Sequence, residues 1–332
     1  MKPEDKHADA ILRVCTYRRL DFDLVTVRSR PYVTEVVQVS LQTAFEISPA
    51  TGLGDLDYLP EELLIMVIKN LDILTYFRFR RVNRYARILS TVPREYQLVA
   101  KYGVEGLRAL LRSDCARRFT IMDIYHLLIT DTCGLCGNFG GFLFLLTATR
   151  CCFTCLQESS KLRVISTTDF ARRAGISTHQ LNVSYGSTLR TVSGQYSMST
   201  EGSRRPKKLI LKDEAIAALD SQGVLKENSL GFLSSRCEIH AQRLMASTTF
   251  PWYNTRTGKA EYGVSCKGCH VRSLTVRATR GDGDKAFSTA GFLSHFASCV
   301  EARDIWAQSK EGTVPVFDSV FIRQGGFLNI KN

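Results

Sequence analysis

Paired cysteines are the feature that most restricts what this chain of 332 residues can fold into. Six of its eleven cysteines form three Cys-x-x-Cys pairs, Cys133/Cys136, Cys152/Cys155 and Cys266/Cys269. The first residues, MKPEDKHADA, are charged where a secretory signal would be apolar, so we expect an intracellular, reducing environment. Disulfides do not persist there, and cysteine pairs at this spacing then predict metal sites, most often zinc.

The first predicted zinc site consists of Cys133, Cys136, Cys152 and Cys155. Fifteen residues separate the two pairs, and they include Gly140-Gly141 and an apolar run, which predicts a β-hairpin that returns the second pair to the first. Four thiolates would complete a tetrahedral zinc site and leave no position for water, so the predicted role is structural. Cys151 adjoins Cys152 and can replace it as a ligand. Buried cysteines without metal are the alternative interpretation.

The second predicted zinc site consists of Cys266, Cys269, His295 and Cys299. Ser288 or Thr289 can begin a helix that runs to about Ala307 and would place His295 and Cys299 on one helix face. A Cys-x-x-Cys turn that faces such a helix is typical of zinc fingers, although the spacer of twenty-five residues is long. Three other residues compete as ligands: His270, Cys237 and His240. Two structural zinc ions per chain are therefore predicted.

Residues 53–100 have the pattern of three consecutive helices. Pro60 suits the first position of a helix, and Leu64, Val67, Ile68 and Leu71 then form one apolar stripe. Asp72 can cap a second helix and Asn83 a third. Three short helices cannot enclose a large core. Five apolar residues outside the stripe, Leu59, Leu63, Ile65, Ile73 and Phe79, are therefore candidates for a face that binds a partner.

The segment LDYLPEELLIMVIKNLDILTYFRFRRVNRYARIL, residues 56–89, resembles an F-box. The matching residues are Leu59-Pro60, Glu62, Leu63, Ile68, Leu71-Asp72, Leu74, Phe77, Arg81-Val82-Asn83 and Tyr85. Ile73 departs from the pattern, because many F-boxes have proline after the Leu-Asp pair. With the later cysteine pairs, CKGC and FLSHFASC, the whole chain also resembles a group of fungal F-box proteins. An ordinary helical hairpin is the alternative interpretation.

The resemblance implies a function in protein degradation. F-box proteins dock to a Skp-type adaptor and, through it, to a cullin–RING ubiquitin ligase. The residues that we expect to contact the adaptor are Leu59, Pro60, Leu63, Ile68 and Leu71. The rest of the chain would hold an unknown target protein and would itself carry out no chemistry.

The remaining segments complete the predicted organisation. Residues 1–52 are expected to form a poorly ordered or loosely docked arm, although Val33–Leu41 is rich in β-branched residues and could be a strand. Residues 101–236 contain two helices, the first cysteine module and a middle linker with a Ser/Thr/Gly-rich loop at Gly186–Gly202, a basic cluster at Arg204–Lys208 and a helix at Leu209–Leu219. Residues 237–332 would form a zinc-finger-like module. The predicted class is α+β.

The net charge of +12 leaves a second function open. Together with two zinc modules it would suit a nucleic-acid-binding protein, but the positive charge is spread along the chain, so binding is expected to be weak and non-specific. An enzyme is disfavoured, because a closed four-thiolate site activates no water and the cysteine pattern lacks the central Cys-x-His of a RING. The longest nearly apolar run, Gly140–Ala148, is half of what a bilayer requires, so we expect a location in the cytoplasm, the nucleus or both.

Overall fold

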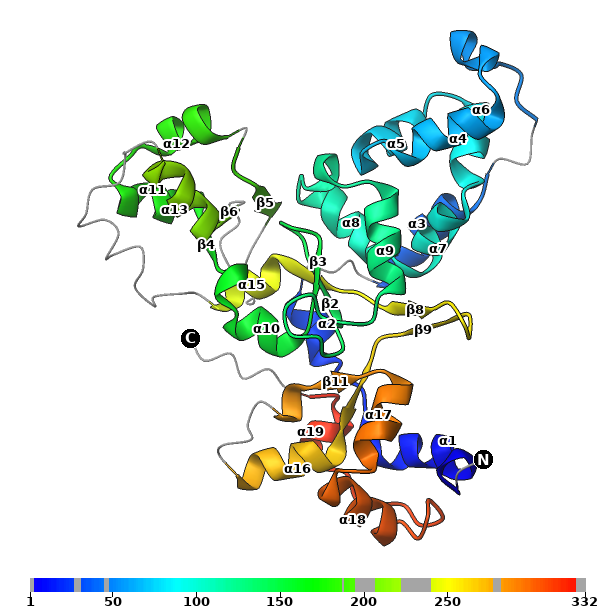
Figure 1. The fold of residues 1–332 in the computed structure, drawn as a ribbon, viewed down its shortest axis with the longest axis vertical. Helices are drawn as coiled ribbons and strands as arrows, with labels where there is room; N and C mark the ends of the chain where they lie inside the picture. Colours follow the sequence, from blue (N-terminus) through cyan, green and yellow to red (C-terminus); the bar gives the residue numbers. More distant parts are fainter. Residues whose placement is uncertain are drawn as a thin grey trace.

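The structure is a computed structural model, and it describes residues 3–26, 31–44, 48–186, 188–194, 207–221, 240–276 and 282–326. Helices and small antiparallel sheets form three lobes around a central region (Figure 1). One lobe holds the helices of residues 31–129, a second holds residues 164–221, and the third combines the N-terminal segment with residues 264–323. This mixture of helices and antiparallel sheets confirms the predicted α+β class.

Three short helices follow one another after a short 3₁₀ helix at Gly54–Tyr58. They are α4 (Glu61–Lys69), α5 (Ile73–Phe79) and α6 (Arg84–Thr91). The Asp72 carboxylate accepts the N–H of Thr75 at 3.0 Å, and the Asn83 side chain accepts the N–H of Ala86 at 2.8 Å. Both predicted caps are therefore confirmed, whereas Pro60 precedes α4 as its N-cap instead of occupying the first helical position.

The three helices share their core with the helices that follow. These are α7 (Arg94–Tyr102), α8 (Val104–Arg112) and α9 (Ile121–Ile129), the last with a Thr120–Asp123 capping box. Tyr76 is fully buried and stacks on Tyr96 with ring centroids 5.2 Å apart. Ile73, predicted to belong to an exposed face, is also fully buried, and its N–H donates to the carbonyl of Phe119. The added helices supply the core that three short helices lack.

The predicted strand at Val33–Leu41 is wrong, because Pro31–Gln42 form helix α3. Among the described residues no strand pairs with this segment, so tertiary contacts override its local preference. The side chain of Gln38 donates to the carbonyl of Lys101 at 2.6 Å, and the hydroxyl of Tyr96 donates to the carbonyl of Leu41 at 2.9 Å. These bonds place α3 against α7.

The central region contains the predicted hairpin between the first two cysteine pairs. Strand β2 (Phe142–Phe144) pairs with β3 (Thr149–Cys151) and with β7 (Ser247–Thr249), and helices α10 (Phe153–Glu158) and α15 (His240–Met245) complete the region. The buried Arg150 donates to the carbonyl groups of Leu127 and Phe250, which ties the hairpin to α9. A separate hairpin follows, with strands β8 (Trp252–Asn254) and β9 (Lys259–Glu261).

The middle segment forms a small three-stranded sheet with helices. Its elements are β4 (Val164–Ser166), α11 (Thr167–Ala174), α12 (Thr178–Tyr185), β5 (Thr191–Gly194), β6 (Lys207–Leu211) and α13 (Lys212–Asp220). The predicted loop at Gly186–Gly202 thus includes a strand, and the helix expected from Leu209 begins only at Lys212. Arg204–Pro206 of the basic cluster lie outside the described residues. These local preferences give way to pairing of β6 with both β4 and β5.

The N-terminal segment belongs to the C-terminal lobe. Helix α1 (Pro3–Cys15) packs on α17 (Thr289–Phe296) and α18 (Val300–Gln308), and β1 (Thr16–Tyr17) pairs with β10 (Val264–Cys266), which also pairs with β11 (Ala286–Phe287). Helices α16 (Lys267–Thr275) and α19 (Val320–Arg323) complete the lobe. The loosely docked arm predicted for residues 1–52 is therefore not observed in this part, because buried apolar residues such as Ile11 and Cys15 join the core of the lobe.

Helix α2 (Asp21–Val25) connects the lobes. Phe22 stacks on Phe153 with ring centroids 4.4 Å apart and also contacts Phe142, so the segment after β1 inserts its ring into the central core. Within the described residues, no helix has the length and apolar character needed to cross a membrane.

Candidate metal centres and an exposed helical face

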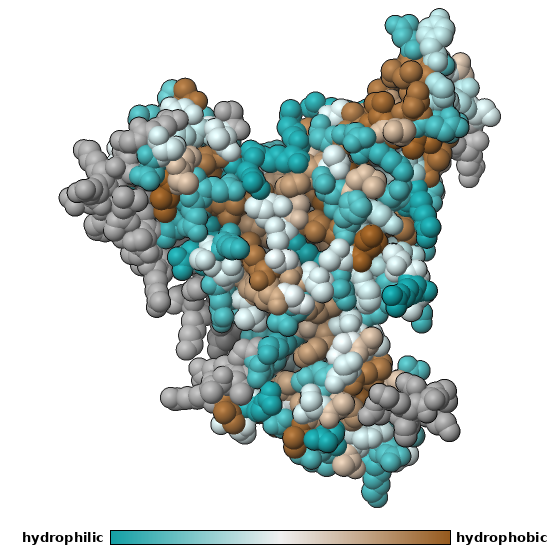
Figure 2. Space-filling model, in the orientation of Figure 1, coloured by the Kyte–Doolittle hydropathy of each residue, from teal (hydrophilic) through white to brown (hydrophobic). Residues whose placement is uncertain are grey.

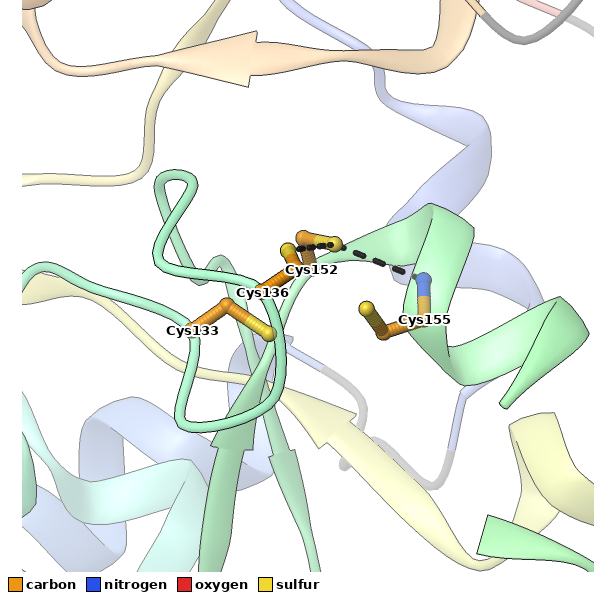
Figure 3. A group of neighbouring side chains, drawn as sticks. All are labelled: Cys133, Cys136, Cys152 and Cys155. Atoms are coloured by element: carbon orange, nitrogen blue, oxygen red, sulfur yellow. Dashed lines mark hydrogen bonds between the residues drawn. The ribbon is translucent and has the colours of Figure 1, made fainter. Parts of the chain in front are cut away.

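The first predicted cluster forms where the hairpin brings the two cysteine pairs together. Cys133 and Cys136 lie on the turn before β2, Cys152 caps α10, and Cys155 lies in its first turn, with the thiols directed toward a common centre (Figure 3). All four Sγ atoms lie within 4.8 Å of one another, and those of Cys136 and Cys152 are 3.6 Å apart. A tetrahedral zinc site with Zn–S bonds of 2.3 Å places its sulfurs roughly 3.8 Å apart, so the donor set fits zinc.

Backbone amides support the thiolates of the first cluster. The N–H of Leu135 donates to the Sγ of Cys133 and the N–H of Cys155 donates to the Sγ of Cys152, each at 3.4 Å. The hydrogen bond from Cys152, together with such N–H donors, lowers the pKa of Cys133 to about 4. A thiol held as the thiolate near neutral pH is ready to bind a metal ion.

Cys151, the alternative ligand, does not belong to the first cluster. It ends strand β3, is fully buried and is not one of the four grouped sulfur ligands. Burial raises the pKa of Cys151 well above its usual value, so its thiol stays protonated. Cys152 instead lies after the strand as the N-cap of α10, and it is this residue that reaches the cluster.

The second predicted cluster lies in the C-terminal lobe. The ligand atoms of Cys266, Cys269, His295 and Cys299 also lie within 4.8 Å of one another. The Sγ of Cys299 is 3.9 Å from that of Cys266 and 4.0 Å from that of Cys269, and the Nε2 of His295 is 3.2 Å from the Sγ of Cys269. This set of three sulfurs and one imidazole again matches the ligands and spacing of a structural zinc site.

The helix that was to carry both His295 and Cys299 is interrupted. Ser288 caps α17, as predicted, but the helix ends at Phe296, and Cys299 is the residue before α18. The two ligands nevertheless converge, because the N–H of Cys299 donates to the carbonyl of His295 across the break. The expectation of a continuous helix to Ala307 is therefore wrong, while the ligand set is preserved by a tight turn.

The close approach of the four side chains in the second cluster shifts the pKa values of Cys299 and His295. Hydrogen bonds from Cys266 and Cys269 lower the pKa of the Cys299 thiol, and the hydrogen bond with Cys269 raises the pKa of His295 to about 9. The N–H of Cys269 donates to the Sγ of Cys266 at 3.4 Å. The sulfur of Cys299 is thereby favoured in its deprotonated form, which is the form that binds a metal ion.

The competing ligands do not join the second cluster. The ring of His270 stacks on Phe321 with centroids 4.3 Å apart and an angle of 8°, away from the four grouped ligands. Cys237 and the side chain of His240 lie outside the described residues. Cys15 is buried beside the cluster, but its thiol donates to the carbonyl of Ala302, and burial raises its pKa to about 12.

One face of α4 is apolar and exposed, and no other described part of the chain covers it. Leu63 is 46% exposed, Met66 60% and Val67 53%, and these three residues are spaced i, i+3 and i+4 on the helix. Leu59 and Tyr58 precede them at the surface. Figure 2 shows hydrophobic residues gathered over this end of the molecule. Exposed apolar patches of this kind mark interaction sites.

Five residues were expected to contact the adaptor. The structure exposes only some of them. Leu59, Pro60 and Leu63 lie at the surface, whereas Leu71 is half-buried and Ile68 is only 2% exposed in the core of the chain itself. Ile68 therefore supports the face rather than forming it. Sequence reasoning missed Met66 and placed Val67 inside, because the buried stripe of α4 is narrower than predicted and contains only Leu64 and Ile68.

Comparison with known proteins agrees with this geometry. Residues 56–98 match the family model of the F-box domain. The matched segment covers helices α4, α5 and α6, the start of α7 and the exposed apolar face of α4. No curated protein and no solved structure matches the chain. Because the predicted motif, the three short helices and the family model coincide, residues 56–98 of this chain form an F-box domain.

Proposed function

We propose that this chain is the substrate-recognition subunit of a ubiquitin ligase, bound to a Skp-type adaptor and through it to a cullin–RING module. An F-box domain implies such a role in general, and the observation that supports it most here is the uncovered apolar face of α4. Leu63, Met66 and Val67 would bury their side chains against the adaptor, which offsets the cost of their present exposure to water. The complex would form in the cytoplasm, the nucleus or both.

The rest of the chain would hold a target protein and act without catalysis of its own. A bound target has a high effective concentration near the ubiquitin-conjugating enzyme, and that proximity is the contribution of a recognition subunit. Proximity requires a fixed geometry between the F-box and the target-binding part. The common core of α4–α9 and the β2–β3–β7 region supplies this rigidity.

Two zinc ions would stabilise the target-binding part. The first would be held by Cys133, Cys136, Cys152 and Cys155, and the second by Cys266, Cys269, His295 and Cys299. Each set provides four ligands, so the ions would cross-link distant segments and leave no coordination position for a substrate. The first cluster would tie α10 to the hairpin, and the second would tie β10 to α17 and α18.

The proposal is tested by capturing the full chain on an immobilised Skp-type adaptor. Leu63→Asp combined with Met66→Asp should reduce capture at least tenfold, because two charges would enter an apolar interface. Leu274→Asp is the matched control, since this residue is 72% exposed on α16, outside the F-box, and should leave capture unchanged. Far-UV circular dichroism and metal content should be the same in all variants.

Capture that is unaffected by the double substitution would contradict this docking mode. A wild-type chain that does not bind any Skp-type adaptor would reject the proposed function. Ile68 is unsuitable for this test, because changes at a buried position alter folding and binding together.

A further inference from the structure

A groove in the C-terminal lobe is lined by helices α16 and α18. Both helices begin at ligands of the second cluster, since Cys266 is the N-cap of α16 and Cys299 is the N-cap of α18. The helices meet close to these ends, because a Cβ atom on Gly268 would lie 2.3 Å from the backbone nitrogen of Ala302. Beyond this contact, later residues of both helices line a cavity of about 380 Å³. That volume lies in the range of about 300–1,000 Å³ that is typical of ligand sites.

Apolar side chains form much of the wall of this groove. They come from α16, from α18 and from the segment that leads into α19, and they are Val271, Leu274, Ile305, Val316, Phe317 and Ile322. Leu274 is 72% exposed and Phe317 85%. A partner that covered these side chains would remove apolar surface from water, which favours binding.

The charged residues of the groove are mostly acidic. Glu301, Asp304 and Asp318 line it, together with a single lysine, Lys267. Lys267 is 8% exposed and donates to the carboxylate of Asp318 at 2.6 Å, so its charge is neutralised inside the protein. Asp304 is exposed and forms no ion pair with any described residue. On a chain with a net charge of +12, the groove therefore presents an excess of negative charge.

Two arginines lie near the groove, and each already has a partner. Arg272 lies 3.0 Å from the carboxylate of Asp282 and 3.8 Å from that of Glu301. The guanidinium of Arg323 lies over the ring of Phe317, 5.5 Å from its centroid. Neither arginine lines the cavity. The carboxylate of Asp304 is thus available to a cation from a partner.

The imidazole of His270 also lines the cavity. His270 is 6% exposed, and its Nε2 has no hydrogen-bond partner among the described residues. A buried polar atom without a partner costs free energy until a hydrogen-bonding group pairs with it. The cavity therefore favours an occupant that has polar groups, such as a peptide backbone, over a purely apolar one.

We propose that this groove binds a short, unfolded segment of the target protein in which an apolar side chain lies next to a lysine or arginine. The inference rests on the proposed function, because it names the class of target that the recognition subunit would take. The apolar side chain would be buried beside Ile305 and Phe317, and the cation would pair with Asp304. Helices α16 and α18 lie at the end of the molecule opposite α4–α6, so a bound adaptor would leave the groove open (Figure 1).

The test measures binding of the full chain to an array of peptides of about nine residues. Each peptide has a central leucine, phenylalanine or tryptophan, and its flanking positions carry lysine and arginine, aspartate and glutamate, or serine. The chain should select the peptides with basic flanks. The best of these is then labelled with a fluorophore, and its affinity is measured by anisotropy.

Two pairs of variants examine the apolar wall and the charge separately. Leu274→Asp should weaken binding of the labelled peptide at least tenfold, because it places a charge in an apolar contact. Val183→Asp on α12 is the matched control, since Val183 is 70% exposed outside the groove, and it should leave the affinity unchanged. Asp304→Lys should shift the preference from basic to acidic flanks, a reversal that a merely structural effect would not produce. Asp9→Lys, at an exposed position of α1, should keep the preference of the wild type.

Three results would overturn the proposal. The first is that no peptide of the array binds, or that the selected peptides lack basic flanks. The second is an equal loss of affinity in the control variants. The third is a dimer of the chain in size-exclusion chromatography that Leu274→Asp converts to a monomer, since a second copy would then cover the groove. Capture by the Skp-type adaptor should be the same for all four variants, so failure here is separable from failure of the proposed function.

Discussion

The guanidinium of Arg19 donates a hydrogen bond of 2.6 Å to the carboxylate of Asp284, which lies 265 residues further along the chain. Arg19 also donates two hydrogen bonds of 2.8 Å to Asp21, and the side chains of Arg19 and Asp21 are about 95% buried. Its guanidinium lies over the ring of Phe22 as well. One side chain thus joins the N-terminal segment to the C-terminal lobe.

Loss of this arginine should destabilise the C-terminal lobe. Arg19→Ala leaves the carboxylate of Asp21 buried without its cation, and we expect a loss of about 3–5 kcal/mol in the free energy of unfolding. Arg18→Ala is the control, because the Arg18 side chain is 46% exposed and its pair with Asp23 should contribute only about 0.2–1 kcal/mol. Urea unfolding followed by circular dichroism measures both. Equal effects of the two substitutions would contradict the role assigned to Arg19.

Metal analysis of the purified chain should give two zinc ions per molecule. Cys299→Ser should remove one of them and leave the other, because the two ligand sets share no residue. Acid should release both ions, since thiolates and imidazole bind metal only when deprotonated. Inductively coupled plasma mass spectrometry on wild type and variant provides the counts. A folded chain without zinc, or a Cys299→Ser variant with two ions, would exclude the second site.

The two ions should leave at different rates. Cys136 is exposed and Cys155 half-buried, whereas the three cysteines of the second cluster are all buried. A chelator therefore reaches the first site more easily, although four soft thiolates favour that site at equilibrium. A colorimetric chelator should show two phases, and Cys299→Ser should remove the slow one. Loss of the fast phase in that variant would reverse the assignment.

Acid should weaken the F-box through Asp72. Burial would raise the pKa of this carboxyl, but hydrogen bonds from the hydroxyl and N–H of Thr75 outweigh it, so the pKa is lowered in the folded chain. A lowered folded pKa contributes stability above the unfolded value of about 3.9 and loses it as the pH falls further. In Asp72→Asn the side chain can still cap the helix, but it does not ionise. The difference in unfolding free energy between wild type and variant should therefore shrink below about pH 4, and a difference independent of pH would refute this origin.

Substitutions at two neighbouring residues of α4 should have different effects on the stability of the fold. Ile68→Ala should lower the free energy of unfolding by about 2–5 kcal/mol, because it creates a cavity in a core where Ile68 is 2% exposed. Val67→Ala, one residue earlier and 53% exposed, should change it by less than about 0.5 kcal/mol. Thermal unfolding compares the two. Comparable destabilisation by both would show that the α4 face is covered in solution.

Local signals in the sequence predicted local structure well. The caps at Asp72, Asn83 and Ser288 are each made within three residues, and the hairpin between the first cysteine pairs follows from glycines and spacing. The two groups of cysteine and histidine residues that converge were predicted in the same way, because metal binding would restrict both residue type and spacing. The F-box motif was recognised from the same kind of short-range pattern.

The elements that were predicted wrongly depend on contacts between residues that are far apart in the sequence. Val33–Leu41 has strand-like residues but becomes helical because it packs on α7, and Leu209 joins a strand because β4 and β5 both pair with it. The division of α17 from α18 depends on the geometry of a cluster assembled from three segments. Burial of Ile73 depends on residues that follow the F-box and lie outside the motif.

Strand β1 pairs with β10, Thr16 opposite Cys266, and this has a consequence for the synthesis of the chain. At about 5–20 residues per second, the ribosome needs roughly 12–50 s to produce the partner of a strand that emerged first. During that interval α4–α9 can already fold, while Ile11, Cys15 and Tyr17 have no core to enter. These residues are thus synthesised long before the lobe that encloses them is complete. Chaperones would meet it as an apolar nascent segment, and a truncated product lacking the C-terminal lobe would expose it permanently.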